Sequence, residues 1–194
     1  RTITTTAFSG GADGVVQLGG QPNQTLAINQ SGNSTYAGII TGAGGLAKQG
    51  AGTLTLTGAN TFTGGLNITG GTIDTTGGGT LADTLAVNVG AAGRYIVGAD
   101  DEVGAIANAG TLTANARLIA ASLANTGTAQ LNADFIAHGN LSNAANASLT
   151  ALGNVGIGGN LIRVRRVDHQ ARIVTGREGR EQPASMRPME HAMK

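Results

Sequence analysis

The chain has 194 residues, a net charge of +1 at pH 7, 33 glycines, 40 % hydrophobic residues, and neither cysteine nor tryptophan. Glycine exceeds twice its usual share of roughly 7 % without a G-X-Y period, which excludes collagen, and the low net charge with many aliphatic residues excludes a disordered chain. Without cysteine, disulfides and thiolate metal sites are impossible, so we expect order from short strands of small residues and glycine-containing turns.

Targeting and membrane segments are not expected within these residues. The chain opens with Arg1-Thr2-Ile3 and lacks the apolar segment of a signal peptide. No stretch approaches the roughly 20 apolar residues of a membrane helix. A translocating β-barrel needs many strands of about ten residues with aromatic girdles, whereas this chain has 3 Phe, 2 Tyr and no Trp. We therefore expect neither a signal nor a barrel here.

Residues 42–73 predict a stack of very short strands, whereas residues 1–41, rich in Thr, Gly and Asn, predict irregular outer coils. Residues 53–57 alternate Thr and Leu, so the leucines face one side and the threonines the other. Residues 61–63 and 66–68 repeat this alternation after Gly- or Asn-containing turns. Strands of three to five residues cannot bury enough apolar surface alone, so we expect them to stack as a β-solenoid.

The side chains of this segment divide into a core set and a turn set. The predicted core consists of Leu54, Leu56, Phe62, Leu66, Ile68 and Ile73. The predicted turn residues are Gly50, Gly52, Gly58, Asn60, Gly64, Gly65, Gly70 and Gly71.

A family pattern runs through the same residues. It reads Leu46-x-Lys48-x-Gly50-x-Gly52-Thr53-Leu54-x-Leu56-x-Gly58-x-Asn60-Thr61-Phe62-x-Gly64-Gly65 and ends in Gly70-Gly71-Thr72-Ile73. This pattern resembles the passenger-associated repeat of bacterial autotransporter proteins. The chain departs from it at Leu66, Asn67 and Thr69, where the family more often shows Thr, Thr and Asn.

The resemblance implies a right-handed parallel β-helix within a secreted passenger region. It further implies a structural stalk of a cell-surface adhesin that aids its own secretion and folding and needs no cofactor. The implied location is the bacterial cell surface or the exterior, reached through the outer membrane. The implied partner is the protein's own outer-membrane translocator barrel, and a host surface, the matrix or a second copy are further candidates.

Beyond the repeat, two more short strands are expected over residues 85–89 and 94–97, after a glycine turn at 77–79. A second periodicity begins at Ala105, where three similar triplets recur at steps of 17 and 18 residues. The triplets are Ile106-Ala107-Asn108, Leu123-Ala124-Asn125 and Leu141-Ser142-Asn143. Such a step suits one coil of a small solenoid. The recurring asparagines would stack into an amide ladder, or serve only as favoured turn residues.

The composition changes after Ile162, which divides the chain into two expected regions. Four basic residues precede this point and eight follow it. We expect a β-helical passenger segment over 1–162, with the family repeat at about 42–74 and the second repeat region at about 105–162. Residues 163–194 form an atypical charged tail, which is either disordered, a cap over the open solenoid end, or an unselected artificial end.

No pattern for catalysis or metal binding is found, so we expect no enzyme, no cofactor and no metal. Asp100-Asp101-Glu102 is the one acidic cluster. On a strand its adjacent side chains would point to opposite faces, and on a turn all three would be solvated, so we expect no general acid/base pair. His138 has neither a serine elbow nor a second histidine nearby. Four acidic residues interrupt the arginines of the tail, which argues against nucleic-acid binding. The alternatives are a two-partner-secretion exoprotein and a β-helical polysaccharide-degrading enzyme.

Overall fold

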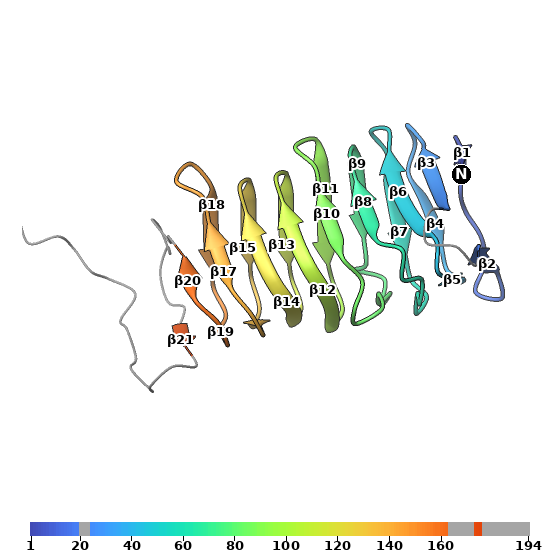
Figure 1. Ribbon diagram of the computed structural model, residues 1–194. Coiled ribbons are helices and arrows are strands. Elements are labelled where there is room, and N and C mark those ends of the chain that lie inside the picture. Colours follow the sequence, from blue (N-terminus) through green and yellow to red (C-terminus); the bar gives the residue numbers. More distant parts are fainter. Residues whose placement is uncertain (20–23, 163–172, 176–194) are drawn as a thin grey trace, which may run out of the picture.

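The computed structural model describes residues 1–19, 24–162 and 173–175. In these residues the chain is all-β, and its parallel strands stack as a β-solenoid of about eight turns. Successive coils follow one another along a rod, with β1 near one end and β21 near the other (Figure 1). None of the described residues forms a helix that could span a membrane. The predicted all-β parallel solenoid is confirmed.

Two long parallel sheets form the walls of the rod. Sheet A contains β1 (Thr2–Thr5), β3 (Thr25–Asn29), β6 (Gly45–Gln49), β8 (Leu66–Ile68), β10 (Val87–Val89), β12 (Asp101–Asn108), β14 (Leu118–Asn125), β16 (Phe135–Ala137), β17 (Leu141–Asn143), β19 (Val155–Ile157), β20 (Leu161–Ile162) and β21 (Ile173–Thr175). Sheet B contains β4 (Ser34–Tyr36), β7 (Thr53–Leu56), β9 (Gly71–Asp74), β11 (Gly93–Val97), β13 (Thr111–Ala114), β15 (Thr128–Leu131) and β18 (Ser148–Ala151). A two-stranded sheet C pairs β2 (Val15–Leu18) with β5 (Ile39–Gly42).

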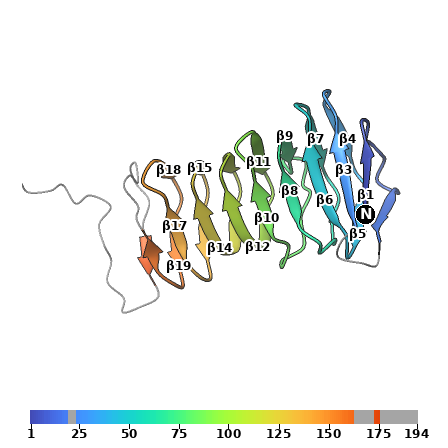
Figure 2. The same cartoon turned by 45° about the horizontal axis from the view of Figure 1, so that its top comes forward.

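Most coils add one strand to sheet A and one to sheet B, and later coils add two shorter strands to sheet A, β16 with β17 and β19 with β20. Inward positions of successive coils therefore line up in columns. One inward column of sheet A passes through Leu46, Leu66, Val87, Ile106, Leu123 and Leu141. The coil length shortens from 20 residues between Leu46 and Leu66 to 17 between Ile106 and Leu123. In the turned view of Figure 2 the same strands still lie side by side, which fits continuous stacking.

The interior is a narrow column of aliphatic and aromatic side chains. The six predicted core residues all lie in it, with exposed fractions of 0 to 1 %. In β7 the leucines are buried and the threonines half-buried, as the alternation predicts. Residues 61–63 differ from the prediction because they form no regular strand, although Phe62 is buried between two exposed threonines. Their backbone instead donates to Ile40 O and Gly42 O of the preceding coil.

The later segments also fit short strands. Of the strand expected over 85–89, only β10 (Val87–Val89) forms, because Leu85 N closes a turn by donating to Ala82 O. The strand expected over 94–97 corresponds to β11. Most of the expected tail over 163–194 lies outside the described residues, so its nature as a disordered segment or a cap stays a prediction. Its described part, β21, pairs in parallel with β19.

Candidate functional site

Three buried asparagines stack at the corner where sheet A leads into sheet B. Asn108, Asn125 and Asn143 end their strands in register, with exposed fractions of 1 to 2 %. Asn108 Nδ2 donates to Asn125 Oδ1 at 2.6 Å, and Asn125 Nδ2 donates to Asn143 Oδ1 at 2.6 Å. The predicted amide ladder is therefore confirmed.

The ladder also satisfies backbone carbonyls that face the interior. Asn108 Nδ2 donates to Thr128 O at 2.8 Å, and Asn125 Nδ2 donates to Ser148 O at 2.8 Å. A buried carbonyl without a donor costs free energy comparable to a lost hydrogen bond, so these bonds stabilise the turns as well as the stack. At the first rung, Asn108 Oδ1 has no hydrogen-bond partner, because its neighbour in the column is Val89.

A lysine occupies the same inward column nearer the N-terminus. The column reads Lys48, Ile68, Val89 and then Asn108. Lys48 is fully buried, and its Nζ donates to Gln49 O at 2.6 Å and to Gly50 O at 3.0 Å. Desolvation by burial lowers the pKa of this ammonium below its usual value. Lys48 was expected only as a family-pattern residue, although its position two residues after buried Leu46 signals an inward side chain.

The predicted turn residues occupy four kinds of environment. Backbone φ is positive at Gly50, Gly65 and Gly71. Three others lie against the backbone of the preceding coil, where a side chain would clash: Gly52, Gly58 and Gly64. Gly70 has ordinary space around it. Asn60 differs from these glycines because its side chain is buried, with an exposed fraction of 1 %.

Asn60 hydrogen-bonds to the coils on both sides of it. Its Oδ1 accepts from Ile40 N at 3.0 Å in the preceding coil. Its Nδ2 donates to Gly58 O at 2.8 Å and to Thr80 O at 3.2 Å, the latter in the following coil. Asn60 thus contributes a cross-coil link at a corner where sheet C has no further strand.

Asp101 is the buried member of the acidic cluster, so the cluster follows the strand alternative, with adjacent side chains on opposite faces, and not the fully solvated turn. Its residue is 9 % exposed, whereas Asp100 is exposed and Glu102 is half-buried. Both carboxylate oxygens accept from Leu81 N, at 3.1 and 3.3 Å, and Oδ1 also accepts from Glu102 N. Asp101 is the first residue of β12 and lies on the inward face of that strand. Its side chain is therefore at a corner of the coil and not in solvent.

Burial, with a smaller contribution from the nearby carboxylate of Asp83, raises the pKa of Asp101 to about 7. The two backbone donors, Leu81 N and Glu102 N, oppose this rise because they stabilise the ionised form. Burial, followed by the charge of Asp101, also raises the pKa of the enclosed Tyr95 hydroxyl.

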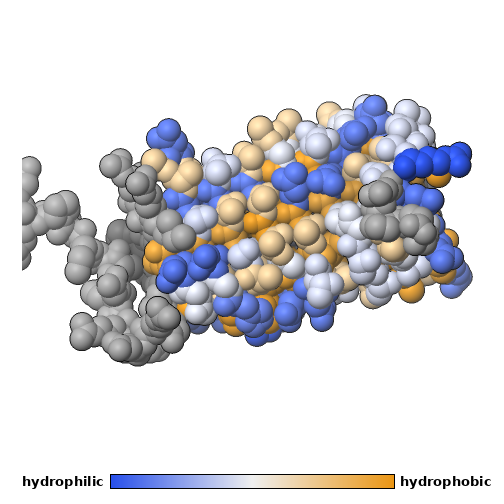
Figure 3. All heavy atoms as spheres, in the orientation of Figure 1, coloured by the Kyte–Doolittle hydropathy of each residue, from blue (hydrophilic) through white to orange (hydrophobic). Residues whose placement is uncertain are grey.

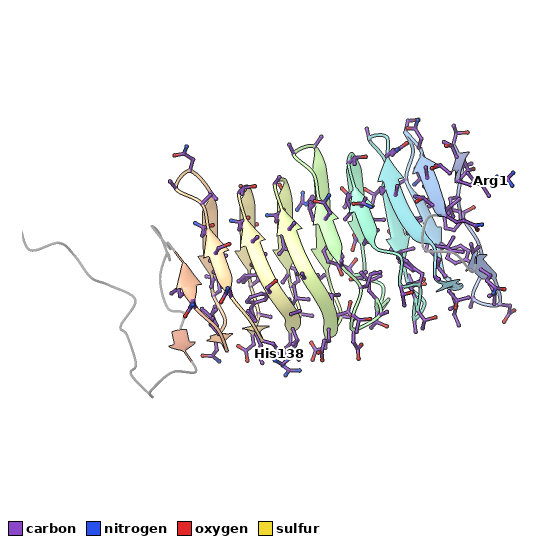
Figure 4. All side chains as sticks on the ribbon, in the orientation of Figure 1. Arg1 and His138 are labelled. Atoms are coloured by element: carbon purple, nitrogen blue, oxygen red, sulfur yellow. The ribbon has the colours of Figure 1, made fainter. Side chains whose placement is uncertain are left out.

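The acidic side chains line a hollow of about 300 Å³ that also includes Arg117. Asp100 Oδ1 accepts a hydrogen bond from Arg117 N. The exposed His138, which is labelled in Figure 4, has its Nε2 atom 3.6 Å from Glu102 Oε1. A general acid must reach a substrate, yet both oxygens of Asp101 already accept backbone hydrogen bonds. The arrangement therefore suits a structural carboxyl better than a catalytic one. Within the described ranges, no three His, Cys, Asp or Glu residues gather as a possible metal site.

The outer face of sheet A is uncharged along its middle. Figure 3 shows an apolar band running along the rod between more polar margins. A shallow groove there is lined mainly by small or polar uncharged residues, including Ala105, Ala107, Ser122 and Ala124. The residues that line this groove include no titratable group.

Comparison with known families gives a match for one segment of the chain, which includes Lys48, Asn60 and Gly71. Residues 46–74 match the family model of the Passenger-associated-transport-repeat. Comparisons with curated proteins and with solved structures gave no match. The match and the β-solenoid together confirm the resemblance to an autotransporter passenger repeat. The repeat family is structural.

The ladder should contribute measurably to stability. We expect Asn125→Ala to lower the free energy of unfolding by about 2–4 kcal/mol, because it leaves buried groups of Asn143 and Ser148 without donors. Equilibrium urea unfolding followed by far-UV circular dichroism measures this change. Asn88→Ala is the matched control, since Asn88 is exposed and bonds only to Asn67 at 3.3 Å. Equal losses in the two variants would contradict a stabilising ladder.

Gly71 should tolerate an added methyl group far less well than Gly78, which also has a positive φ. Gly71 has φ 65°, and an added Cβ would lie 2.4 Å from Gly50 O and from Gly52 O. Gly78 has φ 95° with open space around it. We expect Gly78→Ala to cost about 1–2 kcal/mol through its backbone conformation alone. Gly71→Ala should cost roughly 2 kcal/mol more because of overpacking. The same unfolding experiment compares them, and a smaller loss at Gly71 would refute the tight packing.

Proposed function

We propose that residues 1–162 are a stiff stalk segment in the passenger of an autotransporter adhesin at the bacterial cell surface. The observation that carries this proposal is the repeat at 46–74, whose residues supply both core and corner contacts of consecutive coils. The proposed stalk works mechanically and needs no cofactor. Adhesive contacts would come from exposed Thr and Asn side chains, or from other passenger regions, toward a host surface, the matrix or another copy.

The stacking of coils suggests how such a segment would aid its own secretion. Each strand of sheets A and B bonds to a strand of the next coil, so one formed coil presents a template for its neighbour. Folding that propagates coil by coil outside the cell would oppose return through the outer membrane. The absence of cysteine keeps the exported chain free of disulfides. The proposed partner is a translocator barrel of the same protein.

A second candidate is a two-partner-secretion exoprotein, which would share the solenoid and the adhesin role but use a separate transporter. The 17- and 18-residue steps between the ladder asparagines favour this alternative. The full-length gene distinguishes the two candidates, because an autotransporter encodes its own barrel downstream of the passenger.

Surface display tests whether coil formation is coupled to export. The chain is fused to an autotransporter translocator barrel and compared with its Leu54→Asp and Thr55→Asp variants. Leu54 is fully buried, whereas Thr55 is half-buried on the other side of the same strand. We expect Thr55→Asp to be displayed as a protease-resistant segment like the parent, and Leu54→Asp to lose resistance and surface level several-fold.

The readout is whole-cell protease digestion followed by immunoblotting, with total expression as the internal standard. Equal display and equal resistance of the two variants would contradict a function that depends on coil folding.

A further inference from the structure

Two corners of the solenoid share the same backbone geometry but carry different side chains. Asn60 N donates to Thr80 O at 2.9 Å, and Asp101 N donates to Arg117 O at 3.0 Å, in each case in the following coil. Asn60 Oδ1 accepts from Ile40 N, twenty residues earlier, and Asp101 accepts from Leu81 N at the same spacing. Asp101 therefore occupies the position in its coil that Asn60 occupies in an earlier one.

The two side chains differ in whether they can donate. Asn60 Nδ2 donates to the carbonyl two residues before it, Gly58 O, and to Thr80 O in the following coil. The positions equivalent to these acceptors around Asp101 are Ala99 O and Arg117 O. An ionised carboxylate has no proton to donate, whereas a protonated carboxyl has one O–H donor and keeps an acceptor oxygen for Leu81 N.

We propose that Asp101 is a protonation-dependent link between coils: the proton supplies the donor that Asn60 has in its amide, so the corner closes in acid and loosens when Asp101 ionises. No covalent bond changes, and the proton comes from solvent. The inference does not depend on the proposed function.

Asp101 forms this link next to a stretch, residues 76–84, in which few hydrogen bonds join the backbone to the following coil. Thr75 N donates to Ile96 O and Gly104 N donates to Leu85 O, which ties both ends of the stretch 76–84 to the following coil. Between these two bonds, the hydrogen bonds that join the described residues 76–84 to that coil are those from Leu81 N to Asp101. Asp101 is therefore the residue through which this stretch is hydrogen-bonded to the following coil.

The titratable and charged groups around Asp101 come from five segments of the chain. Asp83 belongs to the turn that precedes β10, Tyr95 to β11, and Arg117 to the turn before β14. On its own element Asp101 lies between Asp100 and Glu102. His138, after β16, reaches this group through Glu102. The immediate surroundings are thus mainly acidic, which favours the protonated carboxyl.

The direction of the pH effect follows from linkage. The folded-state pKa of Asp101 is raised from 3.8 to about 7, so folding favours the protonated form. The resulting stabilisation is complete below about pH 4 and is lost as the pH rises through about 7. A corner that tightens on acidification is the consequence.

The test is the denaturant midpoint of the 194-residue chain measured from pH 4.5 to pH 8.5. We expect the midpoint to fall as the pH rises toward about 7. Asp101→Asn should remove this fall and give the higher midpoint at pH 8, because an amide donates at every pH. Asn60→Asp should add a second fall, and if that variant unfolds at pH 8 it should regain its fold at pH 5.

Two controls separate Asp101 from other titrating groups. Asp74→Asn removes a carboxylate that bonds only within its own turn, to Thr76 N. His138→Gln removes the imidazole whose Nε2 lies 3.6 Å from Glu102 Oε1. Both controls should keep the parent profile. The proposal is overturned if Asp101→Asn keeps the fall, or if the parent shows none between pH 5 and 8.

Discussion

The structure depends on one constraint: backbone polar groups that turn into the interior at a corner need hydrogen-bond partners there or in an adjacent coil. The interior holds aliphatic and aromatic side chains at exposed fractions near zero, so an unpaired carbonyl or amide in it is costly. Strands meet this requirement through the sheets. The corners cannot, because the backbone bends there and its carbonyls point inward, and side chains must supply the missing donors.

The chain meets this constraint in several ways. Near the N-terminus a single buried ammonium, that of Lys48, donates to two corner carbonyls of its own coil. Farther along, the asparagine ladder does the same for several coils and also joins them, because an amide both donates and accepts. Asn60 and Asp101 act at the other corner. These corner links are all formed by side chains of the chain itself.

Much of this fold can be predicted from the sequence, for a physical reason. The alternation of Leu and Thr in residues 53–56 and the spacing of the three asparagines follow directly from strand geometry and coil length, so both appear as patterns. Residues 61–63 show the limit of this reasoning. They alternate correctly and donate to carbonyls of β5 in the preceding coil, yet they form no regular strand.

Lys48 and Asp101 were missed as buried groups because charged residues are usually exposed, and only three-dimensional stacking shows what lies against them. For Asp101 the partner, Leu81 N, lies twenty residues away in a stretch without regular strand pairing. No short-range pattern reports such a contact. The sequence does carry one signal, which is position along the strand. Lys48 lies two residues after buried Leu46, and Asp101 lies two residues before buried Val103, so each is on the inward face of its strand.

The most direct test of the central claim is side-chain amide hydrogen exchange of the asparagines, measured by NMR on the 194-residue chain. We predict that the Nδ2 protons of Asn108, Asn125 and Asn143 exchange at least tenfold more slowly than those of the exposed Asn67 and Asn88. Such protection requires buried, hydrogen-bonded amides at stacked corners. Exchange of the three ladder amides as fast as that of the exposed pair would contradict inward corner bonding as the basis of the solenoid.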